Sequence, residues 1–434
     1  MEIVLPVSLD ALLLLLLGLC HLWYNPVSSA LMVAIMMTYL LLDTVQQGHL
    51  KTQYPLIKER LIFTAKLFLA TLFIFIAVVL PTLRNIADRH ASQPYMYAHD
   101  GLIQTEEAIK FLLAGKNPYT ENYLETPLVE LQKHPGEFGL RTPAPLFHNA
   151  YLPFLFLFSI PFYLISINTI GWYDQRFVYL LLFVGLMVLL PRLTHDWSKR
   201  LSLLIAFGLN LFSALFLIEG RNDVFVLFWL VLALLLLQRR RIALSSATLA
   251  LACTSKHSAL LFLPFYLLYL ADRERLQKAI PLALKAIWPF FLVCGLIIIP
   301  FLIWDGPSFI DDTLLYISGR SSSSFPIWGY NLGRILVAVG LIESRDAYFP
   351  FWIPQLIFGL PTLIWLLKKQ WQDNHLGQCL LGYAAFSLVF IFFSRFLHDN
   401  YLGYIVVIAT IAYFLDPTRF SIKENNASEE PRSI

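Results

Sequence analysis

Charged residues are scarce in this chain. They make up 14% of its 434 residues, while hydrophobic residues make up 58%. A soluble domain carries about 25% charged residues, so this composition excludes a water-soluble globular protein. The net charge of +3 is small and the basic residues are scattered between apolar runs, which excludes a nucleic-acid partner.

Cysteine is also scarce. The four cysteines all lie inside apolar runs, without the C-x-x-C spacing of a metal or redox site. We interpret them as small core or lipid-facing residues; they are Cys20, Cys253, Cys294 and Cys379. The N-terminus lacks a basic n-region and an A-x-A cleavage site, so we expect residues 3–24 to form a retained span and not a cleaved signal.

Long apolar runs are abundant. Runs of roughly 17–23 residues can cross a hydrocarbon layer of about 30 Å. Runs such as 11–17 do not alternate with polar residues, as the strands of a membrane barrel would. The sequence predicts an all-α polytopic membrane protein with about 11–14 transmembrane helices. The candidate spans are 3–24, 26–45, 61–82, 150–167, 177–193, 201–218, 223–238, 242–255, 257–270, 282–304, 331–342, 348–368, 376–394 and 398–415.

These spans form one predicted transmembrane domain, residues 1–415, without a short internal repeat. Two polar segments interrupt it, a long loop at 83–149 and a second loop at 305–330. The tail at 416–434 has no apolar periodicity, so we predict that it is disordered.

Clusters of Lys and Arg set the expected orientation, because they favour the cytoplasmic side. The clusters are 51–60, 192–200, 239–241, 273–278 and 368–369. This arrangement puts both polar loops, 254–257 and 395–400 on the outer face of the plasma membrane, and the tail in the cytoplasm. Four apolar segments lie between the long loop and 239–241, where an odd number of passages is needed. Either 150–167 dips in and returns, or one cluster disobeys the rule. The segment 331–342 is too short to cross.

The long loop holds 8 of the 29 acidic residues and 4 of the 10 histidines. Leu102, Ile109 and Leu112 share one helical face and Gly115 is a helix stop, so we predict an amphipathic helix lying along the membrane surface. A second short helix is expected over 127–133. Asp100 precedes the first helix and is either its N-cap or a general base, two roles that are compatible.

Several segments resemble one family of membrane enzymes. An Asp after a span, followed by an amphipathic helix ending in 112–119, resembles the first outer loop of GT-C glycosyltransferases, and in particular of the polyprenyl-phosphate-mannose-dependent family 87. The likeness covers roughly residues 61–305. Further likenesses, in chain order, are Tyr151-Leu152-Pro153, Gly220-Arg221-Asn222-Asp223, and Ala252-Cys253-Thr254-Ser255-Lys256 followed by Pro264. Two spans precede the one that enters the loop, Arg221 stands where Gln is common, and Ser255 separates Thr254 from Lys256.

The resemblance implies a GT-C-type bundle that transfers a sugar, with mannose expected, from a polyprenyl-phosphate carrier to a glycan or glycolipid acceptor. The anomeric centre would be inverted, and no cofactor or metal would be needed. Asp100 would be the general base and Lys256 would bind the phosphate. The other candidate substrate-binding residues are His99, Asn117, Tyr119, Arg221, Asp223, Arg320, Arg395 and His398.

Structural explanations compete with these roles. Lys256 is also placed to snorkel from a helix end to the interface. The turn at 219–223 is also explained as a solvated turn or an ion pair, Arg320 as part of a solvated loop, and Arg395 and His398 as interface anchors. A metal at His99, Asp100 and His148 would have no defined ligand spacing.

Two functions from other classes remain open, a transporter or flippase and a non-catalytic assembly subunit. A transporter often has inverted repeats and charges near mid-span. Here the charges collect on one face, which favours the enzyme.

Overall fold

The structure is a computed structural model that describes residues 7–22, 25–48, 55–133, 144–271 and 287–416. These residues are 75% helical. Within them, β1 (Trp328–Gly329) and β2 (Phe396–Leu397) form one parallel pair. The prediction of a helical protein is therefore confirmed apart from this pair. The predicted tail beyond Asp416 and the basic cluster at 273–278 lie outside the described residues.

The N-terminal helices are longer than their apolar runs. They are α1 (Leu9–Leu19), α2 (Pro26–Gly48), α3 (Pro55–Ile74), the π-helical turn η1 (Phe75–Val79) and α4 (Leu80–Ala91). The segments α3, η1 and α4 follow one another without a break, so the predicted end of this span at residue 82 is wrong. Hydropathy marks where apolar side chains stop, whereas an exposed helix can continue with polar ones, as in the Arg84–Asp88 pair at 3.6 Å.

The central bundle consists of α8 (Arg176–Leu189), η3 (Leu190–Leu193), α9 (Trp197–Gly208), α10 (Leu211–Glu219), α11 (Asp223–Gln238) and α12 (Ile242–Cys253). The predicted span 201–218 is two helices, α9 and α10, bent by 47°. Asn210 causes the break locally, because its side chain accepts a hydrogen bond from the Ser213 amide and starts a new helix. Helix α11 buries residues on every side, as expected of a central helix that is apolar all round.

Helix α7 (Phe154–Ile170) is one continuous helix, so the prediction that 150–167 dips in and returns is not seen as a break in its backbone. The Phe154 amide donates to Thr254 O after α12, and just after the helix Asp174 pairs with Arg89 near the end of α4. If α7 does not cross, the passages from the long loop to 239–241 would be α8, the α9–α10 pair and α11, an odd number. The sides of the membrane stay a prediction.

The C-terminal half contains η4 (His257–Phe262), α13 (Leu263–Leu270), α15 (Trp288–Ile310), η5 (Asp311–Leu315), α16 (Tyr316–Ser318), α17 (Leu332–Ala338), α18 (Trp352–Pro354), η6 (Gln355–Gly359), α19 (Leu360–Gln372), α20 (Leu376–Phe392) and α21 (Asp399–Phe414). The second loop was predicted from residue 305, but helix continues to Ser318 across a kink at Asp305. Helix α17 has 7 residues, or about 10 Å of rise, and is too short to cross a membrane.

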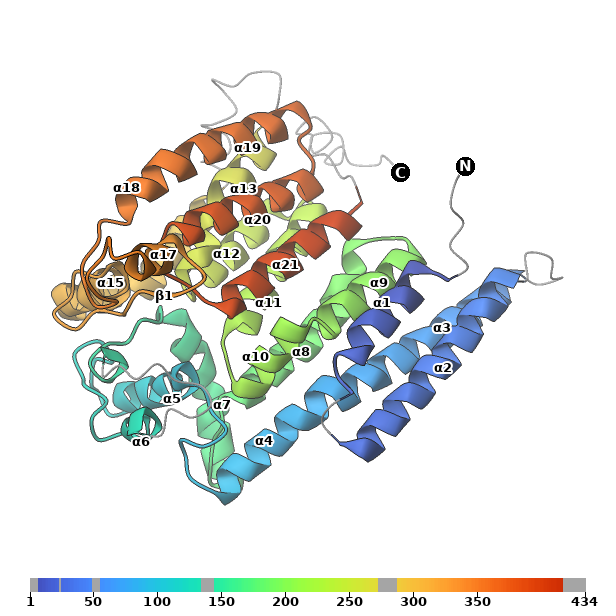
Figure 1. The fold of residues 1–434 in the computed structure, drawn as a ribbon, viewed down its shortest axis with the longest axis horizontal. Coiled ribbons are helices and arrows are strands. Elements are labelled where there is room, and N and C mark those ends of the chain that lie inside the picture. The colour runs from blue at the N-terminus through green and yellow to red at the C-terminus, as the bar shows by residue number, and fades with distance from the viewer. Residues whose placement is uncertain (1–6, 23–24, 49–54, 134–143, 272–286, 417–434) are drawn as a thin grey trace, which may run out of the picture.

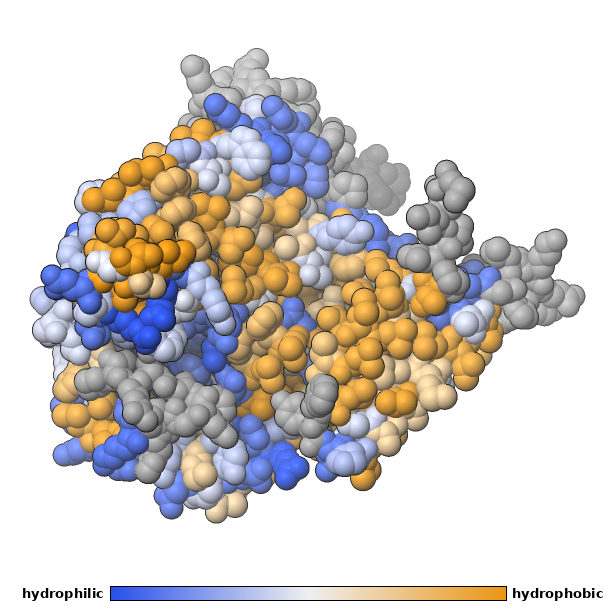
Figure 2. Space-filling view, in the orientation of Figure 1, coloured by the Kyte–Doolittle hydropathy of each residue, from blue (hydrophilic) through white to orange (hydrophobic). Residues whose placement is uncertain are grey.

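Four helices in the described part of the chain are long and apolar enough to cross a membrane, or five with the bent α9–α10 pair. They are Pro26–Gln47, Glu59–Ala91, Arg176–Leu193 and Trp288–Ser318. Seven further apolar helices are 10–17 residues long. Figure 2 shows a broad hydrophobic surface over α2 and α3, which suits contact with lipid. The elements α5 (Asp100–Leu113), α6 (Leu128–Lys133) and η2 (Ala144–Leu146) lie together at one end of the bundle (Figure 1).

Candidate functional site

Helix α5 presents Asp100 in its first turn. The N-cap residue is His99, so the prediction that Asp100 caps the helix is wrong. The Gly101 amide donates to Asp100 Oδ1 at 2.6 Å. A carboxylate at this position also interacts favourably with the positive end of the helix dipole. Gly101 is required here, because a Cβ would meet the Tyr151 hydroxyl.

Helix α5 is not a surface helix, contrary to the prediction. Residues 101–109 are all buried. Leu102 and Ile103 pack in one cluster with Tyr123 and Leu128, while Ala108 and Ile109 pack in another with Tyr119, Phe156, Phe301 and Phe309. Glu106 and Glu107 are covered as well, at 6% and 7% exposed, whereas the Lys110 side chain is 47% exposed. The helix is therefore held rigidly inside the region formed by α5, α6 and η2, which we call the outer region.

A buried ion network holds α5 against α4 and α8. Arg89 donates to both carboxylate oxygens of Glu106, at 2.9 and 2.8 Å, and to Asp174 at 2.9 Å. Arg176 donates to Asp174 and to the carbonyls of Tyr97 and Ile218. Burial alone would raise the pKa of Asp174, but the charges of Arg176 and Arg89 lower it to about 2. This network fixes the backbone two residues before His99.

A cavity of about 1200 Å³ opens beside the first turn of α5. Figure 2 shows hydrophilic residues gathered around a hollow in this part of the surface. The cavity walls come from segments far apart in the chain: 99–104, 145–151, 221–222, 255–261, 314–334, 348–355 and 390–401. Much of its polar wall comes from turns between helices, where side chains reach the outer end of the bundle.

Asp100 forms one polar part of this wall. Its Oδ1 lies 2.7 Å from His99 Nδ1. Nearby, Arg221 pairs with Glu219 at 2.8 Å and with Asp399 at 2.9 Å. Burial would raise the pKa of Asp100, but the charge and hydrogen bond of His99, the Gly101 amide and Arg221 lower it to about 2. Asp100 is therefore ionised at neutral pH.

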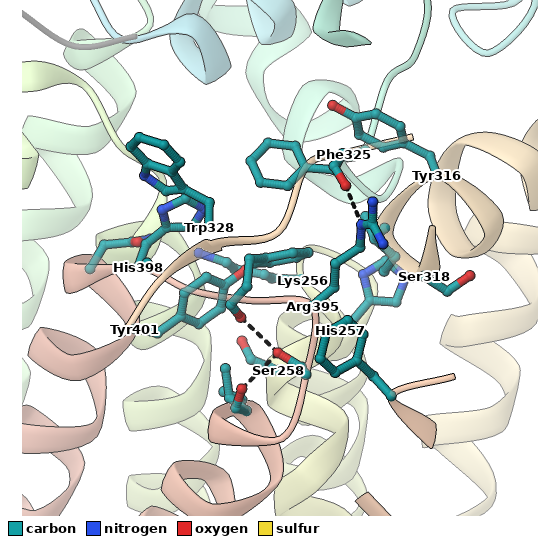
Figure 3. Close-up of a pocket in the computed structure, with 18 of the residues that line it drawn as sticks. Lys256, His257, Ser258, Tyr316, Ser318, Phe325, Trp328, Arg395, His398 and Tyr401 are labelled. Carbon is teal, nitrogen blue, oxygen red and sulfur yellow. Dashed lines mark hydrogen bonds between the residues drawn. The ribbon is translucent and has the colours of Figure 1, made fainter. Parts of the chain in front are cut away.

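Lys256 lies on the same wall between α12 and η4. Its Nζ is 2.7 Å from Asp223 Oδ1, 3.3 Å from Asn222 Oδ1 and 4.6 Å from the ring centre of Tyr401 (Figure 3). Burial would lower the pKa of Lys256, but the charge of Asp223 more than compensates, so the pKa is raised. Lys256 is charged, and Asp223 neutralises part of that charge.

Arg395 is the cavity cation that has only carbonyl partners. It is 2% exposed, and its guanidinium donates to the carbonyls of Phe325, Ala347, Arg345 and Asp346. Figure 3 shows it directed toward Phe325. Among the residues that the structure describes, no carboxylate forms an ion pair with it. The charge of Asp346 acts on Arg395 without a direct ion pair, so Arg395 adds positive charge to this wall although its donors are occupied by carbonyls.

The structure brings together seven of the ten predicted site residues. His99, Asp100, Arg221, Lys256, Arg320, Arg395 and His398 all line the cavity. Arg320 is held loosely, since its guanidinium reaches only Tyr348 Oη at 3.2 Å. Burial and the neighbouring Arg221 and His99 lower the pKa of His398 to about 4, so this imidazole is neutral at pH 7.

The other three predicted residues do not line the cavity. The Asn117 side chain accepts a hydrogen bond from the Tyr119 amide, and Tyr119 Oη donates to Tyr151 O. Both are buried because the turn after Gly115 packs against α5, so they lie away from the cavity and their role in substrate binding stays a prediction. Asp223 lies behind the wall as the partner of Lys256, so it acts at most through Lys256.

Sequence reasoning missed several lining residues, which are Gln104, Tyr316, Trp328, Arg334 and Tyr401. A signal existed for Arg334, since it is a lone charge in the apolar run 331–342, and such charges usually face protein or a wet cavity. Its guanidinium lies 5.6 Å from the ring centre of Trp328. Nothing local distinguished the aromatic residues.

His148 does not join His99 and Asp100. It lies with Asp311 and Asp312, with possible ligand atoms all within 4.8 Å of one another. These groups already satisfy each other: His148 Nδ1 is 2.7 Å from Asp312, and Ser321 Oγ donates to Asp311 at 3.0 Å. The stack of His148 on Tyr316 also fits a structural clamp beside the cavity. That the protein needs no metal stays a prediction.

The chain matches no model of a known protein family and no curated protein. The resemblance to GT-C glycosyltransferases therefore stays a prediction. The functional argument rests on the chemistry of the cavity.

Proposed function

We propose that this protein is a polyprenyl-phosphate-sugar-dependent glycosyltransferase of the plasma membrane, with a GT-C-type bundle of about 11–14 transmembrane helices. It would transfer a sugar, with mannose expected, to a glycan or glycolipid acceptor on the outer face, with inversion. One observation carries the proposal. A single cavity is lined by the carboxylate–imidazole pair of Asp100 and His99 together with Lys256 and Arg395.

The reaction requires both kinds of group. The acceptor hydroxyl must lose a proton as its oxygen attacks the sugar, so a positioned base is needed. The sugar–phosphate bond breaks and leaves negative charge on phosphate, which a fixed cation stabilises. The pair His99–Asp100 supplies the proton acceptor. Lys256 and Arg395 supply the positive charge.

The aromatic side of the cavity supports a lipid-linked donor. Phe349, Phe351, Trp352 and Phe390 line it near the turn that begins α18 and near α20. Beyond this lining, Leu356 and Ile357 of η6 are 54% and 59% exposed, which suits a face in contact with acyl chains. An isoprenoid chain can therefore lie along η6 while its phosphate reaches the cavity.

The direct test uses membranes that contain the full-length protein, incubated with polyprenyl phosphates carrying radiolabelled sugars. We expect label to move to an acceptor with inverted anomeric configuration, and membranes without the protein to show no transfer. A transporter or flippase would move the intact carrier-linked sugar across the membrane without breaking its bond. An assembly subunit would do neither. Either result would overturn the proposal.

A double variant tests whether Lys256 binds phosphate or only pairs with Asp223. The single variant Lys256→Gln leaves the Asp223 carboxylate without its cation, which disturbs folding and function together. Lys256→Gln combined with Asp223→Asn removes both charges. We expect this double variant to reach the membrane at the wild-type level and to transfer sugar about 100-fold more slowly. Wild-type transfer rates in the double variant would show that the pair is only structural.

A further inference from the structure

We infer that His99 Nε2, and not the Asp100 carboxylate, takes the proton from the acceptor hydroxyl, and that Asp100 positions and polarises the imidazole. This inference rests on the proposed sugar transfer and names the atom that acts as its base. It changes the role of Asp100 from catalytic residue to positioning residue.

The hydrogen-bond geometry assigns the tautomer. His99 Nδ1 and Asp100 Oδ1 are 2.7 Å apart, and two acceptors at that distance would repel, so Nδ1 carries the proton and donates it. The Gly101 amide lies within hydrogen-bond distance of two acceptors, Asp100 Oδ1 at 2.6 Å and His99 Nδ1 at 3.1 Å, and we assign it to the nearer one because a protonated Nδ1 cannot accept it. The amide therefore donates to the carboxylate. The lone pair of neutral His99 is then on Nε2.

Nε2 is free to meet a substrate. His99 lines the cavity and its side chain is 19% exposed. Within the described ranges, the structure records no hydrogen-bond partner for Nε2. The backbone on which it stands is fixed, because the His99 amide donates to Glu219 O at 2.9 Å and Arg176 holds Tyr97 O at 2.8 Å. The ring is thus held by its main chain and by Asp100, and its second nitrogen is open to the cavity.

Asp100 is a weak proton acceptor in this setting. Its carboxylate is stabilised by His99, by the Gly101 amide and by Arg221, which together lower its pKa to about 2 despite burial. A base is most effective when its pKa lies near the working pH, and imidazoles ordinarily titrate between about pH 5 and 8. A carboxylate behind the imidazole stabilises the cation that forms when the ring takes a proton.

Other charged and titratable groups surround the pair. Arg221 and His398 face it from the turns before α11 and α21, and Asp399 pairs with Arg221. Tyr151 and Tyr316 approach Asp100 from the segments before α7 and within α16. The pair therefore lies among charged and phenolic groups that come from several elements.

The proposed sugar transfer is a single displacement in which the proton and the electron pair are both accounted for. The acceptor oxygen attacks the anomeric carbon and gives its proton to His99 Nε2. The bond between that carbon and the phosphate oxygen breaks, and its electron pair leaves with the phosphate. The imidazolium, held by Asp100, then releases its proton to water.

The test compares His99→Asn and His99→Ala with the wild type. Asparagine preserves a helix cap, so His99→Asn separates capping from proton transfer. We expect His99→Asn to slow transfer by about 10,000-fold or more, at least as much as loss of Asp100, because it removes the base itself. His99→Ala should regain activity when imidazole is added to the assay. Imidazole should restore little or no activity to Asp100→Asn, which keeps its own ring.

His375→Asn is a matched control. His375 is also an N-cap histidine with an acidic neighbour, since Nδ1 accepts from the Gln378 amide and Nε2 lies 3.4 Å from Asp373. It lies at the start of α20, away from the cavity, so its replacement should leave transfer unchanged. Full activity of His99→Asn, or no rescue of His99→Ala by imidazole, would overturn the inference while transfer itself persists. Absence of transfer by the wild type would instead overturn the proposed function.

Discussion

Asp100→Asn is expected to lower sugar transfer about 1000-fold to 10,000-fold while the folded protein remains in the membrane. The carboxylate sets the tautomer of His99 and stabilises its cation, and neutralising a carboxylate in such a pair is known to cost about this much. An asparagine fills the same space and still accepts the Gly101 amide, so the fold should be kept. The measurement is transfer from a radiolabelled donor, normalised to folded protein.

Asp196→Asn is the control for this change. Asp196 also stands at the start of a helix, where its side chain accepts the Lys199 amide at 2.8 Å, but it lies at the other end of the bundle from α5. Asparagine is a good cap, so transfer and yield should match the wild type. Full transfer by Asp100→Asn would contradict both proposed roles of Asp100, as the base itself and as the support of the His99 imidazole.

Arg176→Met is expected to destabilise the protein by about 3–5 kcal/mol, because it breaks a buried ion network by removing one partner. Arg176 is fully buried, and methionine fills part of its volume without donating a hydrogen bond. The carbonyls of Tyr97 and Ile218 lose their donor, and Asp174 keeps only Arg89. Thermal unfolding in detergent measures the loss, and transfer should fall with it because His99 loses its anchor.

Arg84→Met controls for the loss of an arginine. Arg84 lies on α4 near this network, but its side chain is 72% exposed and its pair with Asp88 is at the surface. Exposed pairs contribute little to stability, so the unfolding temperature should be unchanged. If Arg176→Met were as stable as Arg84→Met, the ion network would not be what stabilises the outer region.

Local patterns predicted local structure well. The apolar face of 102–112 and the stop at Gly115 identified α5 almost to its ends, and the short helix at 127–133 is present as α6. The same pattern misplaced α5 in space, since Glu106 and Glu107 gave it an apparently polar side. The partner that makes burial of Glu106 tolerable, Arg89, and its neighbour Asp174 come from other segments, so the sequence around α5 gave no sign of the network.

The charged residues of the cavity could be predicted from the sequence, because each of them is recognisable by its own side chain. Asp100, Lys256 and Arg395 were identified as charges at outer helix ends, and all three line it. Asn117 and Tyr119 have the residue types of a sugar site, but the turn that contains them packs inward. Trp328 and Tyr401 resembled ordinary aromatic residues of a membrane protein. Only the pairing of β1 with β2 and the docking of α21 bring them to the wall.

Because the cavity joins the start of α5 to the link between α20 and α21, it has a consequence for biosynthesis. Asp100 is made about 300 residues before Arg395. Because a chain elongates at about 5–20 residues per second, roughly 15–60 s pass between the synthesis of Asp100 and the synthesis of Arg395. During that time the ribosome-bound chain has the His99–Asp100 pair but lacks Arg395. A nascent chain released before α20 would therefore lack one wall of the cavity, and the proposed activity would begin only when synthesis is nearly finished.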